Sequence, residues 1–196
     1  MNLSNKTTLE NNRVKLEPLS WNHFEHLLPI ALKHPDLLKY SPPEFGTEKT
    51  LKKYFEQNLN LQKQQLKFPF AIYDKLHYAY AGSTSLMAIS VKDKRLEIGS
   101  TWLAEDFQRT GLNRNCKYLL LQYVFETLNF ERVEFKTDYR NKKSKKAILN
   151  IGATYEGTLR NHTVLSDGYR RDTVYYSILK NEWSIIKNTI FKILTE

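Results

Sequence analysis

The pattern of apolar and polar residues in the first half of the chain predicts one strand, two helices and three further strands. Residues 14–19 alternate with the period of two that a half-buried strand requires. In residues 21–31 apolar side chains recur at helical spacing, after Ser20 as an N-terminal cap and before His34-Pro35, which stops a helix. The same spacing from Thr47 to about Gln65 predicts a second helix. Strands are then expected at 68–73, 78–89 and 96–103.

The second half alternates between helical and strand-like patterns. After the loop at 108–113, apolar residues at helical spacing predict a helix to about Leu128. A short strand is expected at 133–137, and a helix at 142–151 is followed by Gly152, which suits a helix C-terminus. Two more strands, at 153–160 and 171–179, flank the turn at 166–168, and the tail from Asn181 again has helical spacing.

This order of elements predicts a single α+β, or mixed α/β, domain. Strands that first follow one another as hairpins and are later separated by helices imply a mixed, mostly antiparallel central sheet with helices packed on it. A length of 196 residues suits one domain. We expect a flexible N-terminus at 1–12, the domain at 13–180 and a C-terminal helix at 181–196.

Composition narrows the class of protein. A hydrophobic content of 41% is enough for a packed core, and the single cysteine, Cys116, excludes an internal disulfide and a multi-cysteine zinc site. No run of about 18 apolar residues is present, and the polar start does not have the pattern of a secretory signal. We therefore expect a soluble, cytoplasmic protein without a membrane span.

The net charge of +9 points either to a solvated surface or to an anionic ligand or acidic macromolecule. Lysines 142, 143, 145 and 146 form a local cluster, which is more informative than the total.

The segment from the strand at 96–103 to the following helix carries the first chemical signal. The strand leads into Gln108-Arg109-Thr110-Gly111-Leu112-Asn113, and the helix begins at once. The unpaired N–H groups and the positive dipole end of a helix N-terminus bind phosphate well. Gly111 lets the backbone approach a ligand, and Arg109 can add a charge-assisted contact. An ordinary strand-to-helix turn stays open as the alternative.

The chain resembles the GNAT superfamily of N-acetyltransferases in two separate motifs. Glu97-Ile98-Gly99, Trp102-Leu103 and then Gln108-Arg109-Thr110-Gly111 look like its acetyl-CoA loop. The segment 138–144, followed by Ile151-Gly152-Ala153 and Glu156-Gly157, is similar to its second signature. The likeness extends from residue 14 to residue 183, and it is greatest to the branch of ribosomal-protein N-terminal acetyltransferases, whose members tend to end with a strand like 171–177 and a Glu-Trp pair.

The resemblance implies an acetyl-CoA site and an N-acetyltransferase that transfers the acetyl group directly to a primary amine in a ternary complex. Its backbone contacts with pantetheine would come from the strand, and its contacts with pyrophosphate from the loop. Asn113 departs from the family pattern, which has Gly or Ala there, and we expect it to cap the helix. The residues implied to bind the cofactor are Thr101, Trp102, Leu103, Gln108, Arg109, Thr110, Gly111, Leu112, Asn113, Asn141, Ser144 and Lys145.

For catalysis, the resemblance and the residues leave two candidates. Many superfamily members have a tyrosine as the acid where this chain has Ile148, so Ser144 is the hydroxyl that we expect to protonate the leaving thiolate. Glu97 is the expected base, directly or through water. A capping serine and a salt-bridged strand carboxylate are the alternatives, and His162 and Tyr176 are weaker candidates. The spacing of His and carboxylate residues indicates no metal site.

Asn141 can also be explained without a ligand, as the cap of the helix that it precedes. The nearby lysines are equally compatible with the phosphates of coenzyme A and with a solvated face.

A second functional hypothesis is a catalytically decayed fold that binds nucleic acid or another acidic partner. The basic charge and the missing tyrosine favour it, whereas the intact loop favours the enzyme, so nucleic acid is the less favoured partner. The acceptor stays open among a protein N-terminus, a lysine, a polyamine and an antibiotic-like amine. We expect residues 21–65 and 161–171 to contact it, with Phe45, Tyr40 and Trp102 lining an apolar cleft. A homodimer stays open.

Overall fold

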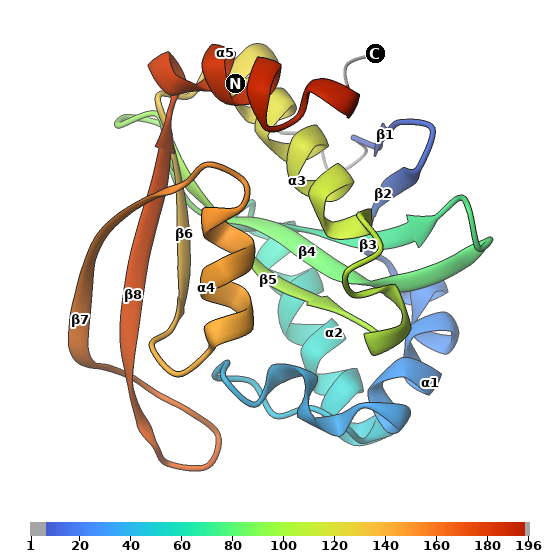
Figure 1. Ribbon diagram of the computed structural model, residues 1–196. Coiled ribbons are helices and arrows are strands. Elements are labelled where there is room, and N and C mark those ends of the chain that lie inside the picture. Colours follow the sequence, from blue (N-terminus) through green and yellow to red (C-terminus); the bar gives the residue numbers. More distant parts are fainter. Residues whose placement is uncertain (1–6, 195–196) are drawn as a thin grey trace.

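A single eight-stranded sheet forms the centre of the protein in the computed structural model, which describes residues 7–194 (Figure 1). Its strand order is β1-β2-β3-β4-β5-β6-β8-β7. Only β5 and β6 pair in parallel, and all other neighbours in this described sheet are antiparallel. The strands are β1 (Leu9–Glu10), β2 (Val14–Pro18), β3 (Lys67–Asp74), β4 (Ala79–Ser90), β5 (Arg95–Leu103), β6 (Arg132–Asp138), β7 (Thr154–Val164) and β8 (Arg170–Leu179).

The mixed, mostly antiparallel sheet, its flanking helices and the C-terminal helix confirm the predicted fold class. Among the elements of the described part, the α-helices are α1 (Phe24–Lys33), α2 (Glu48–Lys63), α3 (Leu112–Gln122), α4 (Lys142–Leu149) and α5 (Lys180–Thr189). The shorter helical turns are η1 (Trp21–His23), η2 (Pro35–Leu38), η3 (Glu105–Phe107), η5 (Lys192–Leu194) and the π-helical η4 (Tyr123–Thr127).

The boundaries differ from the prediction at both ends of the chain. Leu9 and Glu10, which we assigned to the N-terminal segment, pair with β2 as the short strand β1. Residues 1–6 of that segment lie outside the described residues. The C-terminal helix stops at Thr189 and is followed by a separate turn, where we expected one helix to residue 196. No helix between residues 7 and 194 is both long and apolar enough to cross a membrane.

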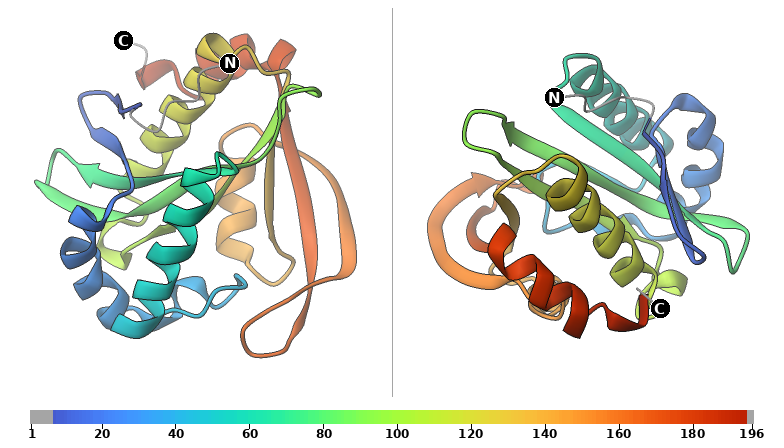
Figure 2. Two further views of the ribbon diagram at one scale, coloured as in Figure 1. Left: turned by 180° about the vertical axis from the view of Figure 1, so that it is seen from behind. Right: turned by 90° about the horizontal axis from the view of Figure 1, so that it is seen from above.

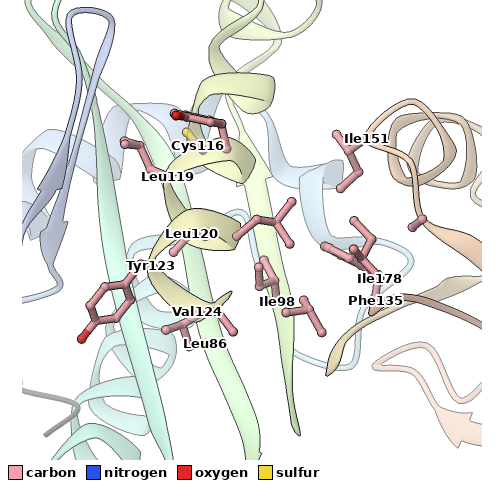
Figure 3. Close-up of a cluster of buried hydrophobic side chains, with 14 of the residues drawn as sticks. Leu86, Ile98, Cys116, Leu119, Leu120, Tyr123, Val124, Phe135, Ile151 and Ile178 are labelled. Atoms are coloured by element: carbon pink, nitrogen blue, oxygen red, sulfur yellow. The ribbon is translucent and has the colours of Figure 1, made fainter. Parts of the chain in front are cut away.

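Helices cover both faces of the sheet, and each face has its own core. Because side chains alternate along a strand, Phe70 and Ile72 of β3 belong to the core under α3, whereas Ala71 between them belongs to the core under α1 and α2. Figure 2 shows α1 and α2 on one side of the sheet and α3 and α5 on the other. Figure 3 shows how the apolar side of α3 packs on β4, β5 and β6. The C-terminal helix contributes Trp183 to this same core.

The strands β5 and β6 pair only where they begin. Their parallel register joins Arg95–Glu97 to Arg132–Glu134 and goes no further, although β5 continues to Leu103. The β4–β5 pairing has an irregularity between Ser83 and Ser85 of β4, where the extra residue lies in β5 and bends that strand. The two strands therefore diverge, as Figure 1 shows. This opening in the middle of the sheet positions the candidate site.

The strand β7 forms one edge of the sheet and is polar and mostly exposed. Two irregularities interrupt its pairing with β8, one between Tyr155 and Gly157 and one between Leu159 and Thr163. Its Glu156 carboxylate accepts hydrogen bonds from the Arg132 guanidinium of β6 and, at 2.7 Å, from the Ser177 hydroxyl of β8. These contacts fasten the edge strand across its neighbour.

Candidate active site

A cleft of about 1040 Å³ occupies the opening between β5 and β6. It is lined by β5, the loop before α3, β6, α4 and the segment between α1 and α2. Among the described residues, the side chains that line it include eight cations from lysine and arginine but only two carboxylates, Asp36 and Glu105. The cations are Lys33, Lys39, Arg109, Lys117, Lys136, Lys143, Lys146 and Arg171. Such a cleft attracts anionic ligands.

The loop before α3 forms a backbone site for an anion. The Gln108 amide donates to the Leu103 carbonyl at 3.0 Å, which ties the loop to the end of β5. Arg109 and Gly111 both have positive φ, of 63° and 87°, and Gly111 is the N-cap residue of α3 with no side-chain capping bond. The Leu112 N–H contacts the Thr110 hydroxyl at 3.4 Å, and since Gly111 has no side-chain acceptor, the next N–H groups of the first turn are left available to a ligand. Our expectation that Asn113 caps the helix is therefore wrong, because the left-handed turn at Gly111 starts the helix earlier.

Two polar side chains of α3 add to this part of the cleft. The Oδ1 atom of Asn113 is buried and has no hydrogen-bond partner among the described residues. One turn later, the Lys117 ammonium donates to the Thr101 hydroxyl at 2.7 Å and to the Thr84 hydroxyl at 3.4 Å. Burial lowers the pKa of Lys117 to about 8. The spacing of four residues between Asn113 and Lys117, which places both on one side of a helix, is the sequence signal that we missed for Lys117.

Helix α4 forms the opposite wall. The Ser144 backbone N–H donates to the Asn141 side-chain oxygen at 3.0 Å, so Asn141 is the N-cap of α4, which was the alternative explanation of this residue without a ligand. Ser144 lines the cleft, and so does Ile148, for which the resemblance suggested a tyrosine. Lys143 and Lys146 also line the cleft, whereas Lys145 lies 4.3 Å over the Tyr139 ring and is absent from the lining. Lys143 and Lys146, and not the predicted Lys145, therefore line the cleft.

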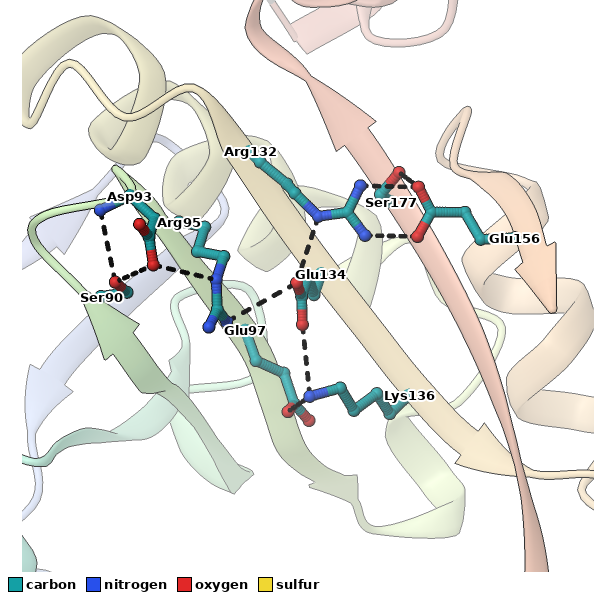
Figure 4. A network of polar contacts seen from close by, with 9 residues as sticks. All are labelled: Ser90, Asp93, Arg95, Glu97, Arg132, Glu134, Lys136, Glu156 and Ser177. Atoms are coloured by element: carbon teal, nitrogen blue, oxygen red, sulfur yellow. Dashed lines mark hydrogen bonds and ion pairs between the residues drawn. The ribbon is translucent and has the colours of Figure 1, made fainter. Parts of the chain in front are cut away.

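On the other face of the sheet, charged side chains form a network where β5 and β6 separate (Figure 4). The Lys136 ammonium contacts the Glu97 carboxylate at 3.0 Å and the Glu134 carboxylate at 3.2 Å. Burial alone would lower the pKa of Lys136, but these two carboxylates raise it overall. Lys136 lines the cleft and Glu97 does not, so Glu97 reaches the cleft only across its ion pair.

Two further cations lie near this network, and Arg171 lines the cleft whereas Lys67 does not. The Lys67 ammonium donates to the hydroxyl of Ser100 at 2.9 Å, and burial lowers the pKa of Lys67 to about 8, against the opposing effect of Glu97. The Arg171 guanidinium donates to the carbonyl oxygen of Tyr40 and to the hydroxyl of Thr173, each at 3.0 Å. This arrangement links β8 to the segment before α2.

The sequence from residue 13 to residue 154 matches the family described as "Acetyltransferase (GNAT) domain". This span includes the divergent strands, the loop and α4. The chain belongs to the GNAT acetyltransferase family. Among solved structures, a "putative acetyltransferase" from T. thermophilus is 35% identical, with a TM-score of 0.86 over 95% of this chain and 96% of that one.

A curated relative, "Putative ribosomal N-acetyltransferase YdaF" of Bacillus subtilis (strain 168), is 34% identical over 102 residues. The match spans 52% of this chain and 55% of that protein, so it covers about half the length of each. A structure of Mycobacterium smegmatis RimJ in complex with CoA-disulfide shares the fold, with a TM-score of 0.78 at 17% identity over 90% of this chain and 89% of that one.

In this GNAT domain, most of the predicted residues surround the cleft, but not all through their side chains. The residues of the prediction that line it are Thr101, Trp102, Leu103, Gln108, Arg109, Asn113, Asn141 and Ser144. Leu112 is fully buried in the core, so only its backbone can face a ligand. Thr110 donates through its hydroxyl to the Phe107 carbonyl at 2.8 Å, which stabilises the loop itself.

The predicted aromatic lining is present in part. Tyr40 and Trp102 line the cleft, whereas Phe45 does not and packs with its ring 5.1 Å from that of Trp102. The weaker catalytic candidates lie elsewhere, since Tyr176 is buried in the core and His162 contacts the Thr173 hydroxyl outside the lining.

Proposed function

We propose that this GNAT protein is an acetyl-CoA-dependent N-acetyltransferase that transfers the acetyl group directly to a primary amine. The observation that carries the proposal is the opening between β5 and β6 with the anion-binding helix N-terminus at its end. The part of β5 that no longer pairs with β6 offers backbone N–H and C=O groups in the cleft, and such groups favour a ligand with amides of its own.

The cofactor half of the cleft comprises the end of β5, the loop, α3 and α4. The residues that would hold the donor are Thr101 to Leu103 for the pantetheine arm and Gln108 to Asn113 for the pyrophosphate. Arg109, Lys143 and Lys146 line the cleft where the other negative charges of the donor need compensation. When bound, acetyl-CoA supplies a thioester that an amine can attack. A backbone N–H of β5 would polarise its carbonyl oxygen.

Ser144 and Glu97 complete the proposed chemistry. The backbone N–H of Ser144 is already used by the Asn141 cap, which holds the residue in place and leaves its hydroxyl to donate a proton to the departing sulfur. Glu97 would accept the proton of the amine through water, since Lys136 stands between its carboxylate and the cleft. The acetyl group thus passes from sulfur to nitrogen, and the thiol and the amide are the products.

The decisive experiment has two steps. Isothermal titration calorimetry should show one binding site for acetyl-CoA and for CoA, and a thiol-release assay over a panel of primary amines should show acceptor-dependent turnover. Absence of heat with both nucleotides, in a protein whose fold is confirmed by circular dichroism, would refute the proposal.

A further inference from the structure

The half of the cleft opposite the cofactor half, here called the acceptor half, carries positive charges that the phosphates of the donor do not explain. It comprises Tyr40, Ser100, Lys136 and Arg171, on the face of the sheet opposite α3 and α4. The register places Lys136 beside Tyr175 and Asp138 beside Thr173, so the side chains of Lys136, Thr173 and, two residues on, Arg171 share that face. The phosphates of a donor held by the loop would lie beyond the C-terminal end of β5, next to α3, on the other face of the sheet.

The carboxylates that β5 and β6 bring to this region are already paired with cations. Glu97 contacts Lys136, and Glu134 contacts both Lys136 and, at 3.1 Å, Arg132. Asp138 accepts two hydrogen bonds from the Arg140 guanidinium, the shorter of them at 2.8 Å. These pairs leave no carboxylate of the described residues within ion-pair distance of Arg171.

Arg171 is therefore a half-buried cation with spare donors. Its two hydrogen bonds go to neutral oxygens, of Tyr40 and Thr173, and a guanidinium has five N–H groups. Burial also lowers the pKa of Arg171, despite the negative charges of Asp138 and Glu97. A partly desolvated guanidinium that faces a cleft and lacks an anion is stabilised by a carboxylate ligand, which it can bind with two parallel hydrogen bonds.

We infer that the acceptor carries a carboxylate group near the amine that is acetylated, and that Arg171 binds this carboxylate. The inference rests on the proposed N-acetyltransferase function and names its substrate class. An amino acid and a peptide with an acidic residue close to its N-terminus share this chemistry. A polyamine does not, because its additional positive charges would meet Lys136 and Arg171 in the lining of the cleft.

The same charges suit an α-amine better than a lysine side chain. An α-amino group loses its proton at a pH near 7.7–8.0, whereas a lysine needs about 10.4. Cations around the acceptor lower the pKa of its ammonium further, so the neutral amine that attacks the thioester forms at lower cost. The carboxylate of the acceptor compensates for the charge that this arrangement would otherwise repel.

The test uses acceptor pairs that differ in one charge. One arm compares the amidated tetrapeptides Ala-Glu-Ala-Ala and Ala-Gln-Ala-Ala, and a second arm compares free alanine with alanine amide, so that the two sources of the carboxylate are distinguished. In thiol-release assays with saturating acetyl-CoA, we expect kcat/KM to be about tenfold or more higher for the carboxylate member of at least one pair.

Arg171→Gln should bring the two members of the preferred pair within about twofold of each other and leave CoA affinity unchanged. Arg170 offers the matched control, because it is the exposed neighbour on the same strand and does not line the cleft. Arg170→Gln should keep the wild-type preference.

The inference is overturned by an equal or greater kcat/KM for both uncharged members, by turnover of spermidine above all four probes, or by a preference that survives Arg171→Gln. If none of the probes is turned over, calorimetry on the CoA-loaded protein decides, and failure of the carboxylate members to bind also overturns it. In each case CoA binding still stands, which separates this failure from failure of the proposed function.

Discussion

The two halves of the cleft are built in different ways. The cofactor half depends mainly on backbone: the unpaired part of β5, the left-handed turn at Gly111 and the first N–H groups of α3. The acceptor half depends on side chains that arrive from β6 and β8, namely Lys136 and Arg171. A backbone site fixes one ligand and tolerates changes of side chain, whereas a side-chain site can be altered residue by residue. We therefore expect donor use to be robust and acceptor choice to be easily changed.

The largest expected effect tests the backbone character of the cofactor half. A Cβ added at Gly111 has no protein atom within 4 Å. In Gly111→Trp the new side chain would therefore fill open space, which is where we place the pyrophosphate. CoA affinity should fall by about 1000-fold, or about 4 kcal/mol, in calorimetry.

Gly168→Trp controls for backbone strain, since Gly168 has a similar φ of 82°, no neighbour within 4 Å and a place in the β7–β8 turn. Both variants should lose a similar amount of stability. Equal loss of CoA affinity in the two would remove the loop from the cofactor site.

The second prediction concerns the buried cation of the cofactor half. The pKa of Lys117 is about 8 in the fold against an ordinary 10.5, so the unfolded chain holds this proton more tightly between those pH values. The free energy of unfolding should therefore gain from Lys117 as pH rises from about 8 to about 10.5. Lys117→Met removes this contribution and should stabilise the protein by roughly 3 kcal/mol at about pH 7, with a smaller advantage at about pH 10.

Urea denaturation of both proteins at several pH values measures the difference. A pH-independent difference would mean that the Lys117 ammonium is not desolvated. Unchanged CoA affinity in the variant would sharpen the view that this half binds through its backbone.

Ser144→Ala tests the one side chain of the cofactor half to which we assign chemistry. Turnover should fall by about tenfold or more while CoA affinity changes little, because the backbone N–H that bonds to Asn141 stays in place. The control is Ser184→Ala on the exposed side of α5. Wild-type turnover in Ser144→Ala would remove the hydroxyl from the mechanism.

The smallest effect is expected for Asn141→Ala. Loss of the cap should cost about 1 kcal/mol of stability. Thr47→Ala removes the corresponding cap of α2, where the Thr47 hydroxyl accepts from the Thr50 N–H at 3.1 Å, far from the cofactor half. If thermal unfolding shows similar losses but only Asn141→Ala weakens CoA binding, Asn141 contributes to the donor site as well as to the helix.

This contrast also explains what could be predicted from the sequence. The loop at 108–113 and the Asn141 cap are contiguous segments whose backbone conformation follows from a few local residues, so their place in the cleft was predictable. Arg171 and Tyr40 are 131 positions apart in the chain, and no local pattern could indicate that they meet. The place of Lys136 in the cleft could not be predicted from the sequence either, because it depends on where β5 and β6 separate.

One local error of prediction, at Asn113, and one prediction that stays open, at Glu97, have physical explanations as well. The residue type of Asn113 suggests a cap, but the positive φ of Gly111 sets the helix start earlier. The position of Glu97 on a strand suggests a carboxylate that faces the substrate, whereas the parallel register brings it to Glu134, and the Lys136 ammonium lies between the two acids. Residue types suggested the chemistry in both cases, and the neighbours decided the geometry.

The irregular strand β7 affects the tendency of the protein to aggregate in a concentrated solution. A long, flat edge strand presents a row of free N–H and C=O groups that can recruit another chain, which is a common start of aggregation. Here the interruptions near Gly157 and Asn161 bend the edge, and charged and polar residues cover it. The opposite edge of the described sheet, β1, is only two residues long. Both described edges of the sheet are thus protected against pairing with the sheet of another copy.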